Sequence, residues 1–213
     1  TILPGDIDTD GIANASPIVL AGATWQDAAG NNTVLTFTPP VTTAVIVDTT
    51  APTITSITSA ASATYVENDN VDFTVNFDEP VNVTDYPRIA ITLTSGTVYA
   101  IYQAGTGSSA LTFRYTVSEN NSDTDGLVLT SPIELNSGTI KDLVGNNTIL
   151  TFALPDTTGL RVDAIYPFIT TVDVPVNKTH KLGDSLDFVI NFSESITLAG
   201  ANSAIDLTIG ANA

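Results

Sequence analysis

The sequence predicts an all-β sandwich fold, and two kinds of local pattern support this prediction. Apolar and polar residues alternate along short runs such as residues 71–77 and 111–117, which is the pattern of a strand with one buried face. Turn-forming residues separate these runs, for example at 67–70 and 145–147. Many short strands separated by turns at this spacing are typical of a β-sandwich.

An internal repeat is the third observation, and it predicts that the fold occurs in tandem. Residues 6–11 read D-I-D-T-D-G, and residues 121–126 read N-S-D-T-D-G about 115 positions later. The same offset relates residues 71–79 to residues 186–194. Residues related by this offset are called equivalent. A unit of about 115 residues is long enough to bury its own core.

The repeat divides the sequence into three predicted parts. Residues 1–49 form the C-terminal part of one repeat, residues 50–165 a complete repeat, and residues 166–213 the N-terminal part of a further repeat. We therefore expect the sequence to be a segment of a longer protein. Pro52 and Pro167 follow the Val-Asp that ends each repeat, so the joints are short and stiffened, and the array is expected to be a semi-rigid rod.

Composition excludes several classes of function. The net charge is −17, with six Lys and Arg against 23 Asp and Glu, which argues against nucleic acid and anionic membrane surfaces as partners. No cysteine is present, so disulfides and thiol chemistry are excluded. No apolar run of about 18 residues occurs, and we expect no membrane insertion.

Two equivalent loops carry residues suited to calcium. Carboxylates at alternate positions before a Gly resemble the first half of an EF-hand calcium loop. Pro17 and Pro132 stand where the bidentate Glu of such a loop is expected, so a last ligand has to come from elsewhere. The alternative is an Asp-rich turn that caps its own backbone. The candidate ligands in these loops are Asp6, Asp8, Asp10, Asn121, Asp123 and Asp125.

Four motifs in order resemble the bacterial Ig-like repeats of very large surface proteins. They are V-D-T-T-A-P-T-I at 47–54, D-F-T-V-N-F-D-E-P-V-N-V at 72–83, L-T-F-R-Y-T-V at 111–117 and G-T-I-K-D-L-V-G-N-N-T at 138–148. The resemblance covers the complete repeat and both partial ones. It implies tandem immunoglobulin-like sandwiches in a secreted, cell-surface adhesin or fibre, in arrays that calcium often stiffens.

The resemblance also makes Asp48 and Asp163, which end their repeats, candidate calcium ligands. A joint cluster would need further acidic residues, and the sequence leaves open whether they meet in space. The D-x-x-G-N loops at 27–31 and 142–146 have the alternative of plain hairpin turns, which we favour. The acidic residues early in the following repeats are Glu67, Asp69 and Glu79 in one, and Asp184 and Glu194 in the other.

An enzymatic function is not expected. His180 is the one histidine, and its equivalent is Tyr65, so a catalytic or zinc site would belong to one repeat alone, with no second His or Cys to share a metal. A solvated loop histidine is the expected role. No nucleophile elbow and no phosphate-binding Gly-rich loop occur.

The predicted function is mechanical. We expect a structural spacer of an extracellular bacterial adhesin or surface fibre, located at the cell surface and stiffened by calcium. Its partners are the neighbouring repeats and, through other parts of the protein, a host or surface receptor. One alternative is an Ig-like module whose loops bind a glycan or a protein. Another is a self-assembling fibre subunit, in which residues 166–213 of one chain combine with residues 1–49 of the next.

Overall fold

The computed structural model describes residues 1–200 and 204, and the regular secondary-structure elements of these residues are all β-strands. Fourteen strands and no helix are found in the described residues, and accordingly none of these residues belongs to a helix that could span a membrane. The chain separates into two compact units, Thr1–Ala164 and Ile165–Ala213. The strands are β1 (Ile7–Asp8), β2 (Val47–Asp48), β3 (Ile54–Thr58), β4 (Ala63–Tyr65), β5 (Asn70–Thr84), β6 (Arg88–Leu93), β7 (Gly96–Ala104), β8 (Ser108–Thr116), β9 (Ser122–Asp123), β10 (Val128–Glu134), β11 (Thr139–Asp142), β12 (Leu160–Asp163), β13 (Ile169–Asp173) and β14 (Val189–Phe192).

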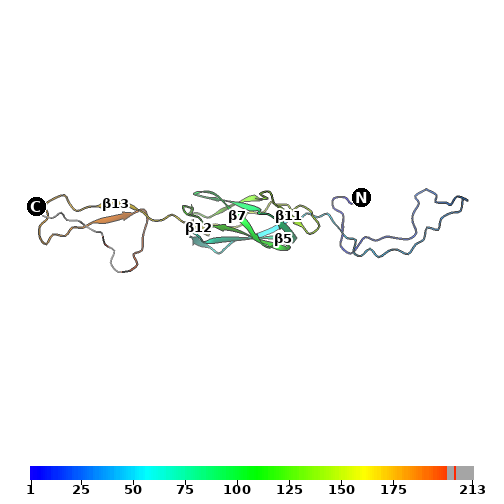
Figure 1. The fold of residues 1–213 in the computed structure, drawn as a ribbon, viewed down its shortest axis with the longest axis horizontal. Helices are drawn as coiled ribbons and strands as arrows, with labels where there is room; N and C mark the ends of the chain where they lie inside the picture. The colour runs from blue at the N-terminus through cyan, green and yellow to red at the C-terminus, as the bar shows by residue number, and fades with distance from the viewer. Residues whose placement is uncertain (201–203, 205–213) are drawn as a thin grey trace. The chain divides into compact units, whose positions relative to one another are not determined.

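The predicted all-β class is confirmed, and the sheets are consistent with a β-sandwich. The larger sheet has seven strands, in the order β10-β6-β7-β8-β5-β11 with β3 also paired to β5, and a smaller sheet has the order β4-β12-β9. Figure 1 shows β5, β7, β11 and β12 from these sheets. The division into three domains stays a prediction. Of the predicted third domain, residues 201–203 and 205–213 lie outside the described residues.

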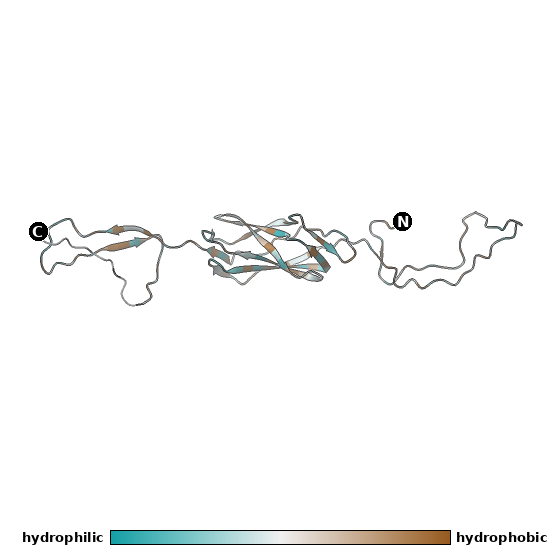
Figure 2. Ribbon diagram, in the orientation of Figure 1, coloured by the Kyte–Doolittle hydropathy of each residue, from teal (hydrophilic) through white to brown (hydrophobic). Residues whose placement is uncertain are grey.

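The core lies between these sheets and follows directly from the alternation in the sequence. Val71, Phe73 and Val75 on β5 are fully buried, as are Leu111 and Phe113 on the neighbouring β8. Successive side chains of a strand point to opposite faces, so the Thr and Asp residues between them lie toward solvent. The hydropathy colours of Figure 2 change from residue to residue along these strands. Each buried side chain of this size contributes about 1.5–3 kcal/mol.

β5 is 15 residues long, and its pairing with β8 is interrupted in the middle. Asn76 pairs with Ala110, and the next paired residue is Val81, opposite Ser108. Pro80 lies inside this gap, where its missing N–H costs no ladder hydrogen bond. Beyond the gap, β5 pairs with β11, where Val81 is opposite Asp142. The interruption therefore frees residues 78–80 close to the end of β11.

Residues 50–164, which correspond to the predicted complete repeat and keep that name below, are assembled from two halves of chain that pair with each other. We call residues 50–115 the front half and residues 116–164 the back half. β10 pairs with β6, β11 with β5, and β12 with β4, so each of these back-half strands needs a front-half partner. The pairing of β9 with β12 is the one back-half pairing made within that half.

The strand pairings of residues 1–49 and of the second unit recur at the equivalent positions of residues 50–164. In residues 1–49, β1 pairs with β2 in the register Ile7↔Asp48 and Asp8↔Val47. β9 and β12 pair in the equivalent register, Ser122↔Asp163 and Asp123↔Val162. In the second unit, β13 and β14 pair in the register Ile169↔Phe192, which is equivalent to Ile54↔Phe77 of β3 and β5.

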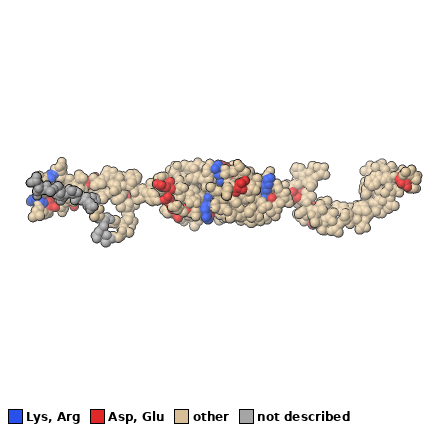
Figure 3. Space-filling view, in the orientation of Figure 1, with Lys and Arg blue, Asp and Glu red and all other residues tan. Residues whose placement is uncertain are grey.

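Two arginines of the larger sheet, Arg88 and Arg114, form ion pairs. Arg114 binds Asp72 through two N–O contacts of 2.7 Å each, and this ion pair lowers the pKa of Asp72, through the hydrogen bond and through the charge of Arg114. Arg88 Nε lies 2.8 Å from Glu134 Oε2. On the face shown in Figure 3, Lys and Arg side chains of this region lie singly and form no patch.

Candidate metal centre

The structure brings three carboxylates together at the start of the complete repeat. They belong to Asp48, Glu79 and Asp142, and one oxygen of each lies within 4.8 Å of the others. Asp142 is buried, and Asp48 and Glu79 are half-buried. In residues 1–200 and 204 this is the one group of at least three His, Cys, Asp or Glu side chains with such a spacing. This triad could hold a metal ion, because clustered carboxylates are hard-cation ligands.

Each ligand of the triad comes from a different element. Asp48 is the last residue of β2, Glu79 lies in the interruption of β5, and Asp142 is the last residue of β11. The backbone N–H of Thr50 donates to Asp48 Oδ1 over 2.9 Å, which orients that carboxylate after the strand ends. Asp48 and Asp142 are the last paired residues of their strands, opposite Ile7 and Val81, and Glu79 lies in the gap of the pairing between β5 and β8.

The loop after Asp142 is held by its own carboxylate. Asp142 Oδ1 accepts the backbone N–H groups of Val144, Gly145 and Asn146 at 2.9, 2.6 and 2.8 Å. Burial raises the pKa of Asp142, but the hydrogen bonds from Asn146, Gly145 and Val144 outweigh burial and leave the pKa below its usual value. The D-x-x-G-N segment is thus the predicted turn, and its Asp is also a member of the triad.

Asn146 connects two members of the triad. Its Nδ2 donates to Asp142 Oδ2 over 2.7 Å and to the main-chain carbonyl of Asp48 over 3.2 Å. The second bond joins residues 98 positions apart in the chain. One amide group therefore holds the end of β2 against the turn that carries Asp142.

Electrostatic repulsion is concentrated on Glu79. Burial and then the negative charges of Asp48, Asp142 and Asp78 raise its pKa. Asp78 behaves differently: burial raises its pKa, but the hydroxyl and backbone N–H of Thr53 donate to it, and the net effect is a lowered pKa. A cation in the triad would remove the repulsion that Glu79 experiences.

Two members of the triad, Asp48 and Glu79, line a cleft of about 390 Å³. Two further acidic residues, Asp8 and Asp78, line the same cleft. Asp8 is one of the predicted loop ligands, so the structure places it at the same cleft as Asp48. The remaining lining residues are Ile7, Thr9, Ile46, Val47, Thr50 and Val144.

The second predicted calcium loop is engaged in backbone contacts. Asp123 is 3% exposed, and its Oδ1 accepts the N–H of Gly126 at 2.7 Å while Oδ2 accepts the N–H of Thr94 at 3.0 Å. Asn121 Oδ1 accepts the hydroxyl of Tyr115 at 2.7 Å and the N–H of Ser118 at 2.9 Å. These are the contacts of the capping alternative, and calcium binding in this loop stays a prediction.

The first loop shows the same backbone cap. Asp8 Oδ1 accepts the N–H of Gly11 at 2.6 Å, as Asp123 does with Gly126. Asp6 Oδ2 accepts the N–H of Leu3 at 2.7 Å. The other predicted ligands, Asp10, Asp125 and Asp163, are exposed, and their metal binding also stays a prediction.

Two of the three triad members, Glu79 and Asp142, are not among the predicted ligands. The sequence marks them only as polar residues that a joint cluster could use. Two sequence signals mark them: an acidic pair before a Pro inside a long strand, and an Asp that opens a D-x-x-G-N turn. Neither signal says that the two positions face Asp48, because β5 and β11 are brought together only by sheet pairing.

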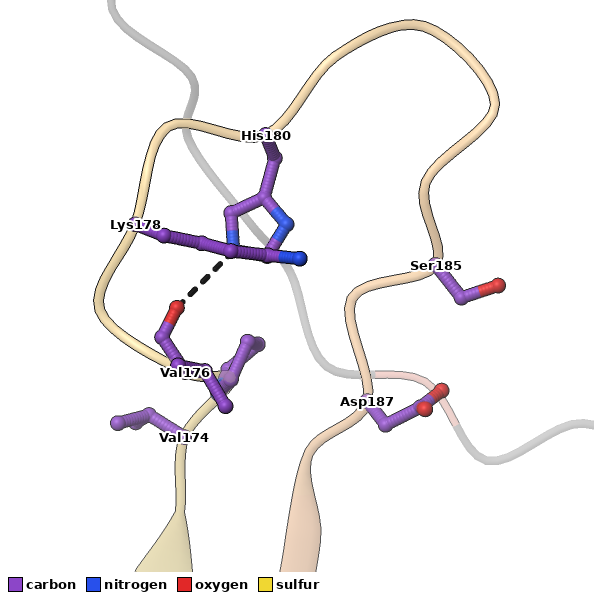
Figure 4. A pocket seen from close by; sticks show the side chains of 7 residues that line it. Val174, Val176, Lys178, His180, Ser185 and Asp187 are labelled. Atoms are coloured by element: carbon purple, nitrogen blue, oxygen red, sulfur yellow. Dashed lines mark hydrogen bonds between the residues drawn. The ribbon is translucent and has the colours of Figure 1, made fainter.

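His180 makes a local contact in a loop of the second unit. Its ring Nε2 lies 3.1 Å from the carbonyl of Val176, as Figure 4 shows, and in that view Ser185 and Asp187 point away from the imidazole. The hydroxyl of the equivalent Tyr65 donates to Ala61, which is equivalent to Val176, over 2.7 Å. The position therefore makes the same loop contact in both repeats, with different side chains.

Comparison with known proteins finds no relative: no family model, no curated protein and no solved structure matches this chain.

Proposed function

We propose that this chain consists of tandem immunoglobulin-like repeats that act as a structural spacer of an extracellular surface adhesin or fibre, and that calcium fixes the joint between repeats. The observation that carries the proposal is the composition of the triad. Asp48 ends the predicted first part, whereas Glu79 and Asp142 belong to the predicted complete repeat. A cation bound there is held by both sides of one joint.

The tandem arrangement is supported by contacts that recur between equivalent residues. Asp27 Oδ1 accepts the N–H of Asn31 at 2.9 Å and Oδ2 accepts its side-chain amide at 2.9 Å. The equivalent Asp142 and Asn146 make the same two bonds. Two segments that form the same turn at the same offset are best explained as copies of one unit.

Calcium is the cation that suits this site best. It accepts six to eight oxygen ligands in flexible geometry, whereas magnesium demands a near-ideal octahedron. Three carboxylates on separate elements, with Asp8 and Asp78 on the same cleft, provide oxygens without a regular frame. Binding to the folded joint alone would stabilise it by RT ln(1 + [L]/Kd).

A mechanical function follows from this chemistry. Without a cation, the like charges around Glu79 oppose the contact between Asp48 and the complete repeat. With a cation, the same charges become attractive, and the joint stiffens. The chain carries an excess of acidic residues and a net charge of −17, so cation binding at each joint would also reduce repulsion along the array.

The test is a thermal melt of the full chain in millimolar calcium and in chelator. Calcium should raise the Tm by several degrees, since a ligand at 100 times its Kd adds about 2.7 kcal/mol. Glu79→Gln should lose most of this rise, and Glu119→Gln, an exposed residue outside the triad, should keep it. An equal Tm in calcium and in chelator for the unchanged chain would rule out the calcium joint.

The self-assembly alternative receives little support from the strand order. Residues 166–213 are equivalent to about residues 51–98, so a composite with residues 1–49 would lack β8 and nearly all of β7. These strands lie in the centre of the larger sheet, between β6 and β5. The composite would therefore contain two separated edges in place of one sheet.

A further inference from the structure

Residues 12–47 expose apolar side chains that are buried at the equivalent positions of the complete repeat. Ile12 is 40% exposed and the equivalent Leu127 is 1% exposed. Trp25 is 49% exposed and the equivalent Ile140 is 2% exposed. Ile18 and Val45 show the same contrast with Ile133 and Leu160. The apolar pattern of a core is therefore present in residues 12–47, but among the described residues these side chains stay exposed.

Local backbone geometry does not explain this contrast, because the two segments make the same internal contacts. The N–H of Ile18 donates to Leu35 O over 3.0 Å, and Ile133 donates to Leu150 O over 3.1 Å. Further equivalent bonds join the N–H of Phe37 to Ser16 Oγ and that of Phe152 to Ser131 Oγ, at 2.9 and 3.0 Å. The hydroxyl of Thr42 donates to Ile12 O, as that of Thr157 does to Leu127 O.

The difference lies in the strands that cover each segment. In the complete repeat the back half is covered by the front half, through β10 on β6, β11 on β5 and β12 on β4. Residues equivalent to β10 and β11 form no strand in residues 12–27, because a strand needs a hydrogen-bonded neighbour. The β1–β2 pairing, which needs no front half, does form.

We propose that residues 12–47 are a binding surface for the front half of a repeat, namely a chain segment with the strand pattern of residues 50–115. The interface is already established in this structure, between residues 50–115 and 116–164. The partner would add strands opposite residues 13–19 and 24–27 and would cover Ile12, Ile18, Trp25 and Val45. Because the exposed face is apolar and the same motif order occurs in both segments, the partner is a front half-repeat and not an unrelated ligand.

The strand order requires that the partner be a complete front half. β5 and β8 form the most extensive pairing of the larger sheet, over residues 70–76 and 110–116. A segment that ends before β7 would leave β5 and β6 apart, and the strands that it offers to residues 12–27 would not be held in one sheet. Residues 166–213 of a second copy are such a segment, and they are not the occupant proposed here.

The experiment joins an additional copy of residues 50–115 to Thr1 of the full chain. Thr1 is equivalent to Thr116, so the added Tyr precedes Thr as it does in the complete repeat. Trp25 is the one tryptophan of the chain, and its emission reports on this segment alone. We expect the fusion to shift the Trp25 emission to the blue, to lose most acrylamide quenching, and to gain a second cooperative unfolding transition. All measurements are made in chelator, so that the result does not depend on the triad.

Two controls make the outcome decisive. An added copy carrying Phe73→Asp and Phe113→Asp, both fully buried in the complete repeat, should leave Trp25 exposed. In the unfused chain, Trp25 should stay exposed at every protein concentration. The proposal is overturned if the fusion leaves Trp25 exposed, or if the doubly substituted copy covers it equally well. Concentration-dependent covering in the unfused chain would overturn it too, since the occupant would then be a second copy.

Discussion

At the scale of single residues, the same side chain can close a turn and serve a cation site. Asp142 uses Oδ1 to cap three backbone N–H groups and Oδ2 to hold Asn146, and it still lies within reach of Asp48 and Glu79. Its equivalent Asp27 closes the same turn in an exposed segment. The turn is therefore a local property, and a group that could hold a metal ion arises only where other carboxylates lie beside it.

Glu79 should destabilise the metal-free protein. Its pKa is raised by burial and by Asp48, Asp142 and Asp78, so the folded state binds its proton more tightly than the unfolded state does. Protonated Glu79 therefore favours the folded state relative to ionised Glu79. This contribution to stability is fully present below the unfolded pKa near 4.5 and is lost as pH rises through the folded pKa. In chelator at pH 7, Glu79→Gln should raise the Tm.

The pH profile provides the check on this assignment. The Tm difference between Glu79→Gln and the unchanged chain should shrink as pH falls below about 4.5, where Glu79 is protonated in both states. In calcium the order should reverse, because the substitution removes a ligand. If Glu79→Gln lowered the Tm in chelator at pH 7, repulsion at this site would be refuted.

Asn146 should contribute more to the free energy of unfolding than its equivalent Asn31. Asn146→Ala removes the bonds to Asp142 Oδ2 and to the Asp48 carbonyl, and hydrogen bonds to charged groups contribute about 1.5–3 kcal/mol. Asn31→Ala removes a similar bond from an exposed turn and should change the unfolding free energy by less than about 0.5 kcal/mol. Urea denaturation in chelator compares the two. Equal losses would mean that the contact across the joint has no energetic role.

At the scale of elements, interruptions of regular strands position the functional groups. Glu79 lies in the gap of the pairing between β5 and β8, and Asp142 is the last residue of β11 paired with β5, opposite Val81. Elsewhere the strands alternate regularly and build the core. Turns between elements are also constrained, because a Cβ added to either glycine of the repeated D-x-D-G motif, Gly11 or Gly126, would lie within 3 Å of backbone atoms.

Gly126→Ala should destabilise the repeat more than Gly145→Ala does. Both glycines have positive φ, 114° and 104°, so each substitution strains the backbone by about 1–3 kcal/mol. A Cβ on Gly126 would lie 2.6 Å from Thr158 Cα, whereas a Cβ on Gly145 meets nothing within 4 Å. Urea titrations in chelator should show the larger loss for Gly126→Ala. Similar losses for both would indicate that backbone conformation alone sets the cost.

At the scale of the whole molecule, the core of residues 50–164 needs both halves of the chain that form it. Front and back halves bury one core there, and in the described residues outside it the paired strands are β1 with β2 and β13 with β14. The proposed function adds a second dependence, on cations at the joints between repeats. On that proposal, an array would gain rigidity from complete repeats and from occupied joints together.

The sequence by itself determined the all-β class, the buried face of the runs 71–77 and 111–117, and the D-x-x-G-N turns. These features depend on residues that lie close together in the chain. Only the tertiary structure decided that Glu79 and Asp142 meet Asp48, because that meeting requires the interrupted pairing of β5 and the pairing of β5 with β11. It also decided that Asp123 is buried, because one of its carboxylate oxygens accepts the N–H of Thr94, 29 residues away in the chain. Contacts between nearby residues determine the turns, and long-range strand pairing determines which carboxylates lie close together.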